Sequence, residues 1–292
     1  SAVRLDPPNP ELAVGTVFGA NMKNMATLFA VALAFGGKLF FEKVAPQQGY
    51  LIVFATFITG LAVLFSAIKF EVDAFDIGLS SAILILVFVA GMWWVYSTRP
   101  RQDRDFQDDV NGGVMTLRKT WVMFLGVSAG VVVSGFFLAW STDQIAETTG
   151  ISSSTLGILL VSLVTTMPEL AAAIAAARMG AMDLGVAGIY GSCAFNMTVL
   201  FYADLFYRDG IVLNQAEPAH FVAGGVAIAL MLVGLVLILS RNRIRSAVVT
   251  AVLSLMAVAY IGAAVVVATL GITEEDNSGE NASVLPGRKL NE

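Results

Sequence analysis

Cysteine and histidine are almost absent from this sequence of 292 residues, which contains one of each. A single cysteine excludes a disulfide bond within these residues. One cysteine and one histidine also exclude the thiolate or imidazole sites that usually hold zinc. Any metal ion bound here must therefore be held by oxygen atoms, which favours a hard cation.

Charged residues are scarce as well. They make up 13% of the chain, whereas 57% of the residues are hydrophobic and the mean hydropathy is +0.78. A soluble domain carries about twice that share of charge, so the composition predicts a polytopic membrane protein whose main partner is the lipid bilayer. The net charge of −5 comes without a basic patch, so no nucleic-acid partner is expected.

Eight apolar segments are long enough to cross a bilayer as helices, which takes about 20 residues. They predict an all-α bundle of eight transmembrane helices. A polar connector, 98–119, separates the first three segments from the other five, and a polar tail, 272–292, is expected to be disordered. The segments are 11–36, 50–68, 76–97, 120–140, 152–178, 182–206, 220–240 and 246–270.

Lysine and arginine are divided unequally between the two sides of this bundle. One side carries eleven of them and the other side five. The richer side is expected to face the cytoplasm, which predicts a plasma or cytoplasmic membrane protein with a cytoplasmic 98–119 connector and both chain ends outside. The richer side holds Lys38, Lys43, the basic residues of the connector, Arg178, Arg241, Arg243 and Arg245.

One apolar segment carries a proline and a carboxylate side by side, at Pro168 and Glu169. Pro168 removes a backbone donor and clashes with the carbonyl one turn earlier, so it predicts a broken helix. Glu169 places a carboxylate at hydrocarbon depth, where a charge costs several kcal/mol. Ser192 and Asn196 lie four residues apart in the next segment and so share one helix face. Transporters bind cations with oxygen ligands on broken helices at mid-depth, so this pattern predicts a cation site.

An internal repeat relates residues 11–25 to residues 183–197 at an offset of 172. The charge count places the loop before the first copy outside and the loop before the second copy inside, so the copies are expected to have the inverted topology of secondary transporters. The same offset places the partner of Glu169 before Ser1. The identical pairs are Leu12/Leu184, Val14/Val186, Gly19/Gly191, Asn24/Asn196 and Met25/Met197.

Residues 150–197 resemble an alpha-repeat of the sodium/calcium exchanger superfamily, the cation/calcium antiporters. Repeats of that family usually read Gly-Thr-Ser-Leu-Pro-Glu on one helix and Gly-Asn-x-x-Gly-Ser-Asn-x-x-Asn (or Asp) on the next. Here residues 164–169 read Val-Thr-Thr-Met-Pro-Glu, and residues 187–196 read Ala-Gly-Ile-Tyr-Gly-Ser-Cys-Ala-Phe-Asn. Residues 15–24 keep only the second half of the pattern, Gly-Thr-Val-Phe-Gly-Ala-Asn-Met-Lys-Asn.

The resemblance implies both a fold and a ligand set. Family members have ten helices in two inverted halves, so this chain would correspond to helices three to ten. Residues 1–97 would be the remainder of the first half, and residues 120–271 the second half with its alpha-repeat at 150–197. Glu169 would be the central carboxylate of the cation site. The other implied ligands are the hydroxyls of Thr165 and Thr166, the carbonyl of Ser162 in the unwound part of the same helix, Ser192, Asn196 and Asn24.

Several positions depart from the family pattern. Ala20 stands where the first repeat should offer a serine hydroxyl, and Lys23 precedes Asn24. A buried ammonium at Lys23 would repel a bound cation or pair with a carboxylate, so both positions are candidates for altered ion coupling. In the second repeat, Val164 and Cys193 replace a glycine and an asparagine.

The residues and the resemblance together predict a secondary active antiporter that exchanges Ca²⁺, or a similar divalent cation, for Na⁺ or H⁺ by alternating access. Two alternatives remain: a cation/proton antiporter with an altered site at Lys23, and a divergent, transport-inactive membrane scaffold. Enzymatic chemistry is not expected, because the sequence has no His-Glu-x-x-His helix and no paired aspartates on facing helices. No cofactor is expected besides the transported ions.

Overall fold

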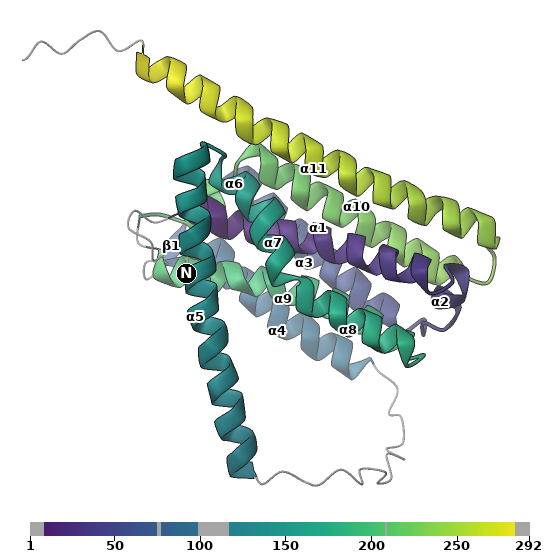
Figure 1. Ribbon diagram of the computed structural model, residues 1–292. Helices are drawn as coiled ribbons and strands as arrows, with labels where there is room; N and C mark the ends of the chain where they lie inside the picture. The colour runs from purple at the N-terminus through teal and green to yellow at the C-terminus, as the bar shows by residue number, and fades with distance from the viewer. Residues whose placement is uncertain (1–8, 75–76, 99–116, 208, 284–292) are drawn as a thin grey trace, which may run out of the picture.

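The computed structural model of the protein describes residues 9–74, 77–98, 117–207 and 209–283, and this part is almost entirely helical (Figure 1). Two strands of two residues, β1 (Asp73–Ala74) and β2 (Ile77–Gly78), pair antiparallel with Asp73 opposite Gly78. The other elements are α1 (Pro10–Ala34), α2 (Lys38–Glu42), α3 (Gln48–Ile68), α4 (Leu79–Ser97), α5 (Leu117–Thr149), α6 (Ser153–Leu156), the π-helix η2 (Gly157–Val161), α7 (Ser162–Thr165), α8 (Met167–Arg178), α9 (Met182–Phe206), the 3₁₀ helix η3 (Val212–Gln215), α10 (Pro218–Ser240) and α11 (Ser246–Ser283).

The predicted all-α membrane bundle is confirmed. Among the described residues, seven helices are long and apolar enough to cross a bilayer. The remaining predicted segment, 152–178, is a broken span, in which Ser153–Thr165 and Met167–Arg178 meet at an angle of 42°. The chain therefore places a break where Pro168 predicts one.

Two helices run further than the hydropathy pattern predicts. Helix α5 continues past residue 140 to Thr149, because the polar residues there remain compatible with a helix until Gly150, which takes a φ of 70° and ends it. Helix α11 continues past residue 270 to Ser283, so the expected disorder of the tail is wrong for residues 272–283. Hydropathy marks where a helix leaves the bilayer and does not mark where it ends. The rest of the tail, and residues 99–116 of the connector, lie outside the described residues.

The internal repeat is present in the structure as well as in the sequence. Adding 172 to the bounds of α1 gives the bounds of α9, and the same shift places α3 within α10 and α4 within α11. The contacts repeat too, because α1 packs against α10 and α11 whereas α9 packs against α3 and α4. Helices α1 and α9 run in opposite directions past one another (Figure 1). This is the predicted inverted topology.

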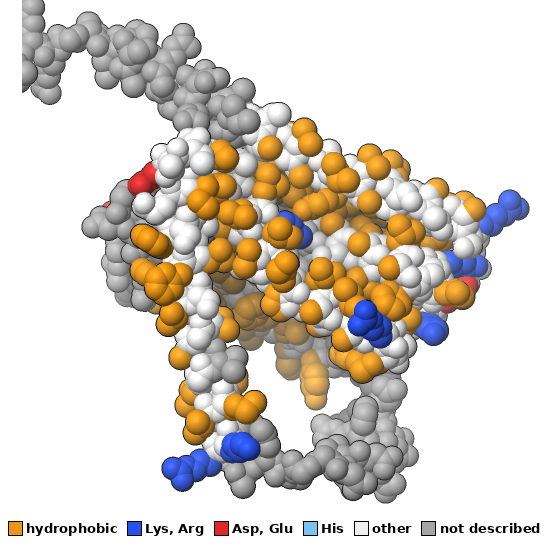
Figure 2. Space-filling view, in the orientation of Figure 1, with side chains coloured by type: hydrophobic (Ala, Val, Ile, Leu, Met, Phe, Trp, Pro, Cys, Tyr) orange, Lys and Arg blue, Asp and Glu red, His pale blue; other side chains and the backbone are white. Residues whose placement is uncertain are grey.

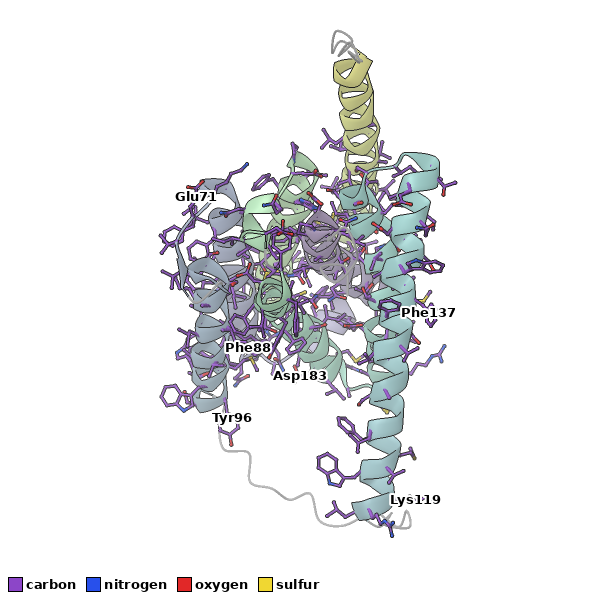
Figure 3. All side chains as sticks on the ribbon, turned by 90° about the vertical axis from the view of Figure 1, so that its left-hand side faces the viewer. Glu71, Phe88, Tyr96, Lys119, Phe137 and Asp183 are labelled. Atoms are coloured by element: carbon purple, nitrogen blue, oxygen red, sulfur yellow. The ribbon has the colours of Figure 1, made fainter. Side chains whose placement is uncertain are left out.

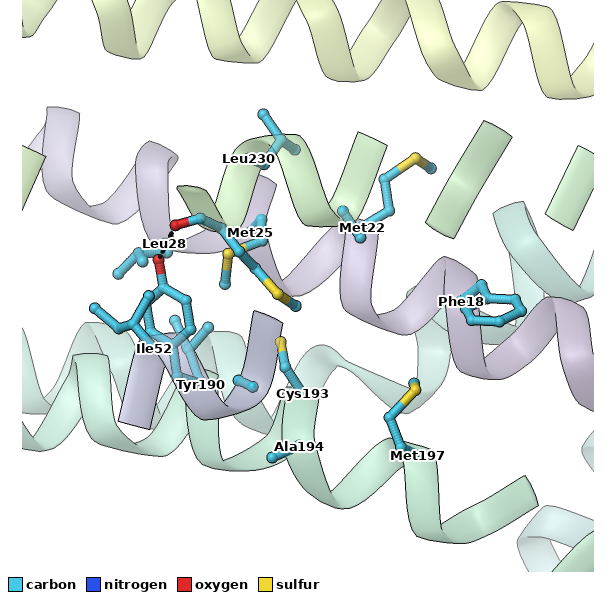
Figure 4. Close-up of a cluster of buried hydrophobic side chains, with 14 of the residues drawn as sticks. Phe18, Met22, Met25, Leu28, Ile52, Tyr190, Cys193, Ala194, Met197 and Leu230 are labelled. Carbon is cyan, nitrogen blue, oxygen red and sulfur yellow. Dashed lines mark hydrogen bonds between the residues drawn. The ribbon is translucent and has the colours of Figure 1, made fainter. Parts of the chain in front are cut away.

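Helix α1 lies in the middle of the bundle and approaches the broken span backbone to backbone. A Cβ atom on Gly19 would lie 2.5 Å from the Cα and carbonyl oxygen of Ile158, and one on Gly157 would lie 2.8 Å from the carbonyl oxygen of Leu12. Small residues permit this close packing of membrane helices. The other faces of α1 join a buried core in which Phe18, Met22 and Met25 meet Tyr190 and Met197 of α9 (Figure 4).

Helix α5 differs from the others because it stands at the edge of the bundle. It packs mainly against α6 and η2, and most of its side chains are exposed. Figure 3 shows Lys119 near its far end, beyond the other helices.

The close approach of α1 to η2 makes a prediction about stability. Gly19→Ala should lower the stability by about 1–3 kcal/mol, because the added methyl group meets backbone atoms that cannot rotate away. Thermal unfolding in detergent, followed by circular dichroism, measures the change. Gly191→Ala, at the equivalent position of the other repeat, is the control, because nothing lies within 4 Å of its added Cβ. Equal melting temperatures for the two variants would contradict the packing argument.

Candidate cation site

The broken span places Glu169 at the beginning of a helix. Thr166 precedes the break with φ −95° and ψ 0°, and Pro168 and Glu169 follow in the first turn of α8. Proline suits this turn because its missing N–H has no partner there in any helix. A carboxylate in a first turn is stabilised by the helix dipole. The break therefore lowers the cost of holding the Glu169 charge inside the bundle.

The Glu169 carboxylate is only partly satisfied. The Ser192 hydroxyl of α9 donates a hydrogen bond of 2.7 Å to Oε1, whereas Oε2 is buried and has no partner among the described residues. Asp204, at the other end of α9, provides a contrast, because its carboxylate accepts from Gly78 N at 2.5 Å, Ser81 Oγ at 2.7 Å and Val212 N at 2.8 Å. Both carboxylate oxygens of Asp204 accept hydrogen bonds, which indicates a structural role, whereas Glu169 has one oxygen without a hydrogen bond.

An amide network joins α1 to α9 beside Glu169. Asn21 Nδ2 donates to Thr59 Oγ1 of α3 and to the carbonyl oxygen of Cys193, both at 3.1 Å. Asn21 Oδ1 accepts from Asn196 Nδ2 at 2.8 Å. Asn196 is one helical turn from Ser192, so the network and the carboxylate contact share one face of α9.

Asn24 faces the same crossing with unused hydrogen-bonding capacity. It is fully buried, and neither its amide oxygen nor its amide nitrogen has a hydrogen bond of normal geometry within the described part of the chain. The Cys193 thiol lies beside it, but a thiol is a weak hydrogen-bonding group. The offset of 172 relates Asn24 to Asn196 and Cys193 to Asn21, so this weak pair is the repeat equivalent of the Asn196–Asn21 bond.

Three of the predicted ligands lie on the broken span and bond within their own helix. The Ser162 carbonyl was expected in an unwound stretch, but it accepts from the Thr166 amide at 3.1 Å and from the Thr166 hydroxyl at 2.8 Å, so that expectation is wrong. The chain is π-helical just before Ser162 and breaks just after it, at Thr166. Thr165 donates to the Val161 carbonyl at 2.9 Å, and its exposed side chain lines a cavity of about 280 Å³ between α1, α5 and α9.

The predicted set is therefore brought together in part. Ser192 contacts Glu169 between α9 and α8, whereas Asn196 contacts Asn21 and Asn24 lies beside Cys193 at the crossing of α1 and α9. The polar groups of all four predicted residues can present oxygen. Hydrogen bonds do not connect Thr165 or Thr166 to Glu169 within the described residues. Oxygen atoms without nitrogen or sulfur donors suit hard cations.

Comparison with known proteins identifies the family of this chain. A family profile described as sodium/calcium exchanger protein matches residues 119–270, more than half of the chain. The chain belongs to the sodium/calcium exchanger family. It is therefore an integral, multi-pass membrane protein.

Curated relatives in the family include human and rat proteins. The human sodium/potassium/calcium exchanger 2 is 28% identical over 118 residues, which are 40% of this chain and 17% of that protein. The human sodium/potassium/calcium exchanger 1 is 29% identical over 130 residues, which are 44% of this chain and 12% of that protein. The matched region is thus a small part of each relative. A crystal structure titled as the H⁺/Ca²⁺ exchanger CAX superposes with a TM-score of 0.46 at 13% identity, covering 91% of this chain and 80% of that one.

Both departures from the exchanger pattern in the first repeat are buried. Lys23 is 7% exposed, and its ammonium donates to the Leu159 carbonyl of η2 at 2.9 Å. No carboxylate lies within 4.0 Å of it among the described residues, so the expected pairing alternative is not seen there. Ala20 is also buried and offers no hydroxyl where its repeat equivalent, Ser192, holds Glu169.

Asn21 and Thr59 were missed by the sequence reasoning, although they complete the amide network of this exchanger chain. A signal for Asn21 was present, because the offset of 172 places it opposite Cys193, where the family pattern has asparagine. No such signal identifies Thr59, because the apolar segments contain many other Ser and Thr residues.

One face of α9 lacks the packing that its equivalent has on α1. Leu12 is 1% exposed beneath the broken span, whereas its equivalent Leu184 is 62% exposed. Gly19 touches Ile158, whereas a Cβ on Gly191 would meet nothing within 4 Å. Among the described residues, the broken span thus covers this face of α1 and no element covers the equivalent face of α9.

The amide network makes a second prediction. Asn21→Ala should lower the thermal stability by about 1–3 kcal/mol, since it removes the partners of Asn196 and Thr59 in a buried region. Thermal unfolding in detergent measures this loss, and Asn242→Ala in the exposed turn after α10 is the matched control. If both variants have the melting temperature of the wild type, the amide network does not contribute to the stability of the fold.

Proposed function

We propose that the protein is a secondary active antiporter that exchanges Ca²⁺, or a similar divalent cation, for Na⁺ or H⁺. One observation carries the proposal: the buried Oε2 of Glu169 has no hydrogen-bond partner in the described part of the chain and belongs to a span that is broken at Thr166. An unpaired carboxylate oxygen inside a membrane bundle is costly. A bound cation would remove that cost.

The surrounding groups fit such a cation by their chemistry. Ca²⁺ takes six to eight oxygen ligands, including carboxylates, amide carbonyls and water. Glu169 and the amide oxygen of Asn24 are oxygens of these kinds on α8 and α1, and the Ser192 hydroxyl of α9 donates a hydrogen bond to the carboxylate. Na⁺ would use a subset of the same oxygens, and a proton would use the carboxylate alone.

Exchange would follow from competition for Glu169. A site that holds either Ca²⁺ or the counter-ion can pass between the two sides when the helices around it rearrange. An empty, charged site is too costly to close off from water. Transport would therefore require that each ion be replaced by the other, with no covalent chemistry on any residue.

A second candidate is a cation/proton antiporter with an altered site, and the buried Lys23 ammonium favours it. Lys23 brings a fixed positive charge into the bundle, and Ala20 removes a hydroxyl of the kind that binds Na⁺. Both changes weigh against Na⁺ as the counter-ion. A transport-inactive scaffold would share these features but would leave the unpaired oxygen of Glu169 without a purpose.

The proposal also covers the setting of the protein. Both ends of this chain would face outward from a plasma or cytoplasmic membrane, with the 98–119 connector in the cytoplasm, as the lysine and arginine distribution favours.

Ca²⁺ flux into liposomes tests the proposal. The full chain is reconstituted, and uptake is driven first by a Na⁺ gradient and then by a proton gradient. Glu169→Gln should lower uptake by about 10- to 100-fold, the effect of losing one charged ligand contact. Glu147→Gln is the control, because Glu147 is exposed near the end of α5 and should leave uptake unchanged.

Binding can be separated from transport by thermal unfolding in detergent. Ca²⁺ at about 100 times its Kd should stabilise the wild type by about 2.7 kcal/mol and should not stabilise Glu169→Gln. Stabilisation without flux would support the scaffold alternative. Neither stabilisation nor flux, from protein shown to be folded, would refute the cation site.

A further inference from the structure

A groove on the outside of the bundle lies between α3, α4 and α10, away from Glu169. Its volume is about 550 Å³, and its lining includes Gln47, Tyr50, Val53, Trp94, Leu235 and Leu239. The rings of Tyr50 and Trp94 meet edge to face with centroids 5.6 Å apart. Gly49 faces this groove, because a Cβ there would be in van der Waals contact with Leu235 and Leu239, at 3.7 and 3.9 Å.

Basic residues flank this groove at the end of the bundle. Lys43 lies three residues before Pro46, which also lines the groove, and Arg241 and Arg243 follow two and four residues after Leu239. Lys43 and Arg243 are exposed. Figure 2 shows Lys and Arg side chains gathered at the end of the molecule where α2 lies. Two carboxylates lie at the same end, but Glu42 pairs with Lys38 and Asp183 accepts from the Ala45 amide. The groove is therefore apolar along its length, and Lys43, Arg241 and Arg243 are the basic residues near its mouth.

The inverted repeat supplies an internal comparison, because the same place exists at the opposite end of the bundle. At the offset of 172, Tyr50 becomes Val222, Trp94 becomes Val266 and Gly49 becomes Phe221, so the aromatic pair is lost and a large ring replaces the glycine. The charges change as well. The positions of Arg241, Arg243 and Arg245 are occupied by Lys69, Glu71 and Asp73.

We propose that this groove is a binding site for an anionic phospholipid. One acyl chain lies against Val53, Leu235 and Leu239, and the headgroup phosphate lies between Lys43 and Arg243. Tyr50 and Trp94 lie at the level of the headgroup, where amphipathic aromatic side chains are favoured. Since the two ends share one backbone scaffold, the fold does not require the aromatic pair at this end, and the basic residues that favour a cytoplasmic orientation here also place cations beside the groove.

Charge complementarity selects a phospholipid over a partner helix. A partner helix could pack against the apolar lining of the groove, but the basic residues at one end would not strengthen its binding. An anionic lipid presents an apolar chain and a negative group in that order, and each lysine or arginine near the membrane surface adds about fivefold to its binding. The site is independent of the proposed cation exchange.

Native mass spectrometry of the full chain in detergent tests the site. Phosphatidylglycerol and phosphatidylcholine with the same acyl chains are compared at equal concentration, and phosphatidylglycerol should give about fivefold or more bound protein. Arg243→Gln should lower phosphatidylglycerol binding by about fivefold and leave phosphatidylcholine unchanged. Lys69→Gln, at the opposite end of the bundle, is the control and should alter neither.

A second variant tests the groove itself and copies the other repeat. Gly49→Phe places the ring of Phe221 at the equivalent position and should abolish retention of both lipids at the site, whereas Trp93→Ala, beside the groove on the exposed side of α4, should not. Equal binding of the two lipids, or an unchanged Gly49→Phe, would overturn the proposal. Binding of free glycerol phosphate as strong as that of phosphatidylglycerol would also overturn it, because the acyl chain would then contribute nothing.

Discussion

A carboxylate inside an apolar helix bundle is costly, and the elements around Glu169 accommodate it. The helix that carries it is interrupted, so that the charge lies at the positive end of α8. Helix α1 can approach that interrupted segment only because Gly19 and Gly157 present no side chains. Ser192 satisfies one carboxylate oxygen and leaves the other open. The backbone break, the glycine packing and the unpaired carboxylate oxygen thus occur together where α1 meets the broken span.

The inverted repeat explains why the polar groups meet where they do. When two related helices cross near the axis that relates them, equivalent residues face one another. Asn21 accordingly bonds to the backbone of Cys193, its own equivalent, and Asn24 and Asn196 lie on either side of that contact. The symmetry is incomplete in its chemistry, because Ala20 stands opposite Ser192 and Lys23 opposite Phe195. The two repeats therefore share a backbone arrangement at the site but differ in the polar side chains that they contribute.

Much of this fold follows from sequence alone, because the bilayer imposes simple rules. A run of apolar residues must form a helix to satisfy its backbone, so the spans were predictable. Proline interrupts a helix, so the break near Pro168 was predictable too, and the repeat was visible as sequence identity at an offset of 172. Helix ends in water obey no such rule, and α5 and α11 accordingly run on. The polar contacts of the site escape prediction for a different reason. Asn21 and Asn196 are 175 residues apart, and only the packing of α1 against α9 brings them together.

The solitary Cys193 gives the wild-type chain a built-in reporter. Its thiol is fully buried at the crossing of the two repeats, beside Asn24. A small thiol reagent can reach it only when water does, and no other cysteine in these 292 residues competes for the label. The rate of its modification thus measures how often the crossing opens in this chain, without an engineered probe.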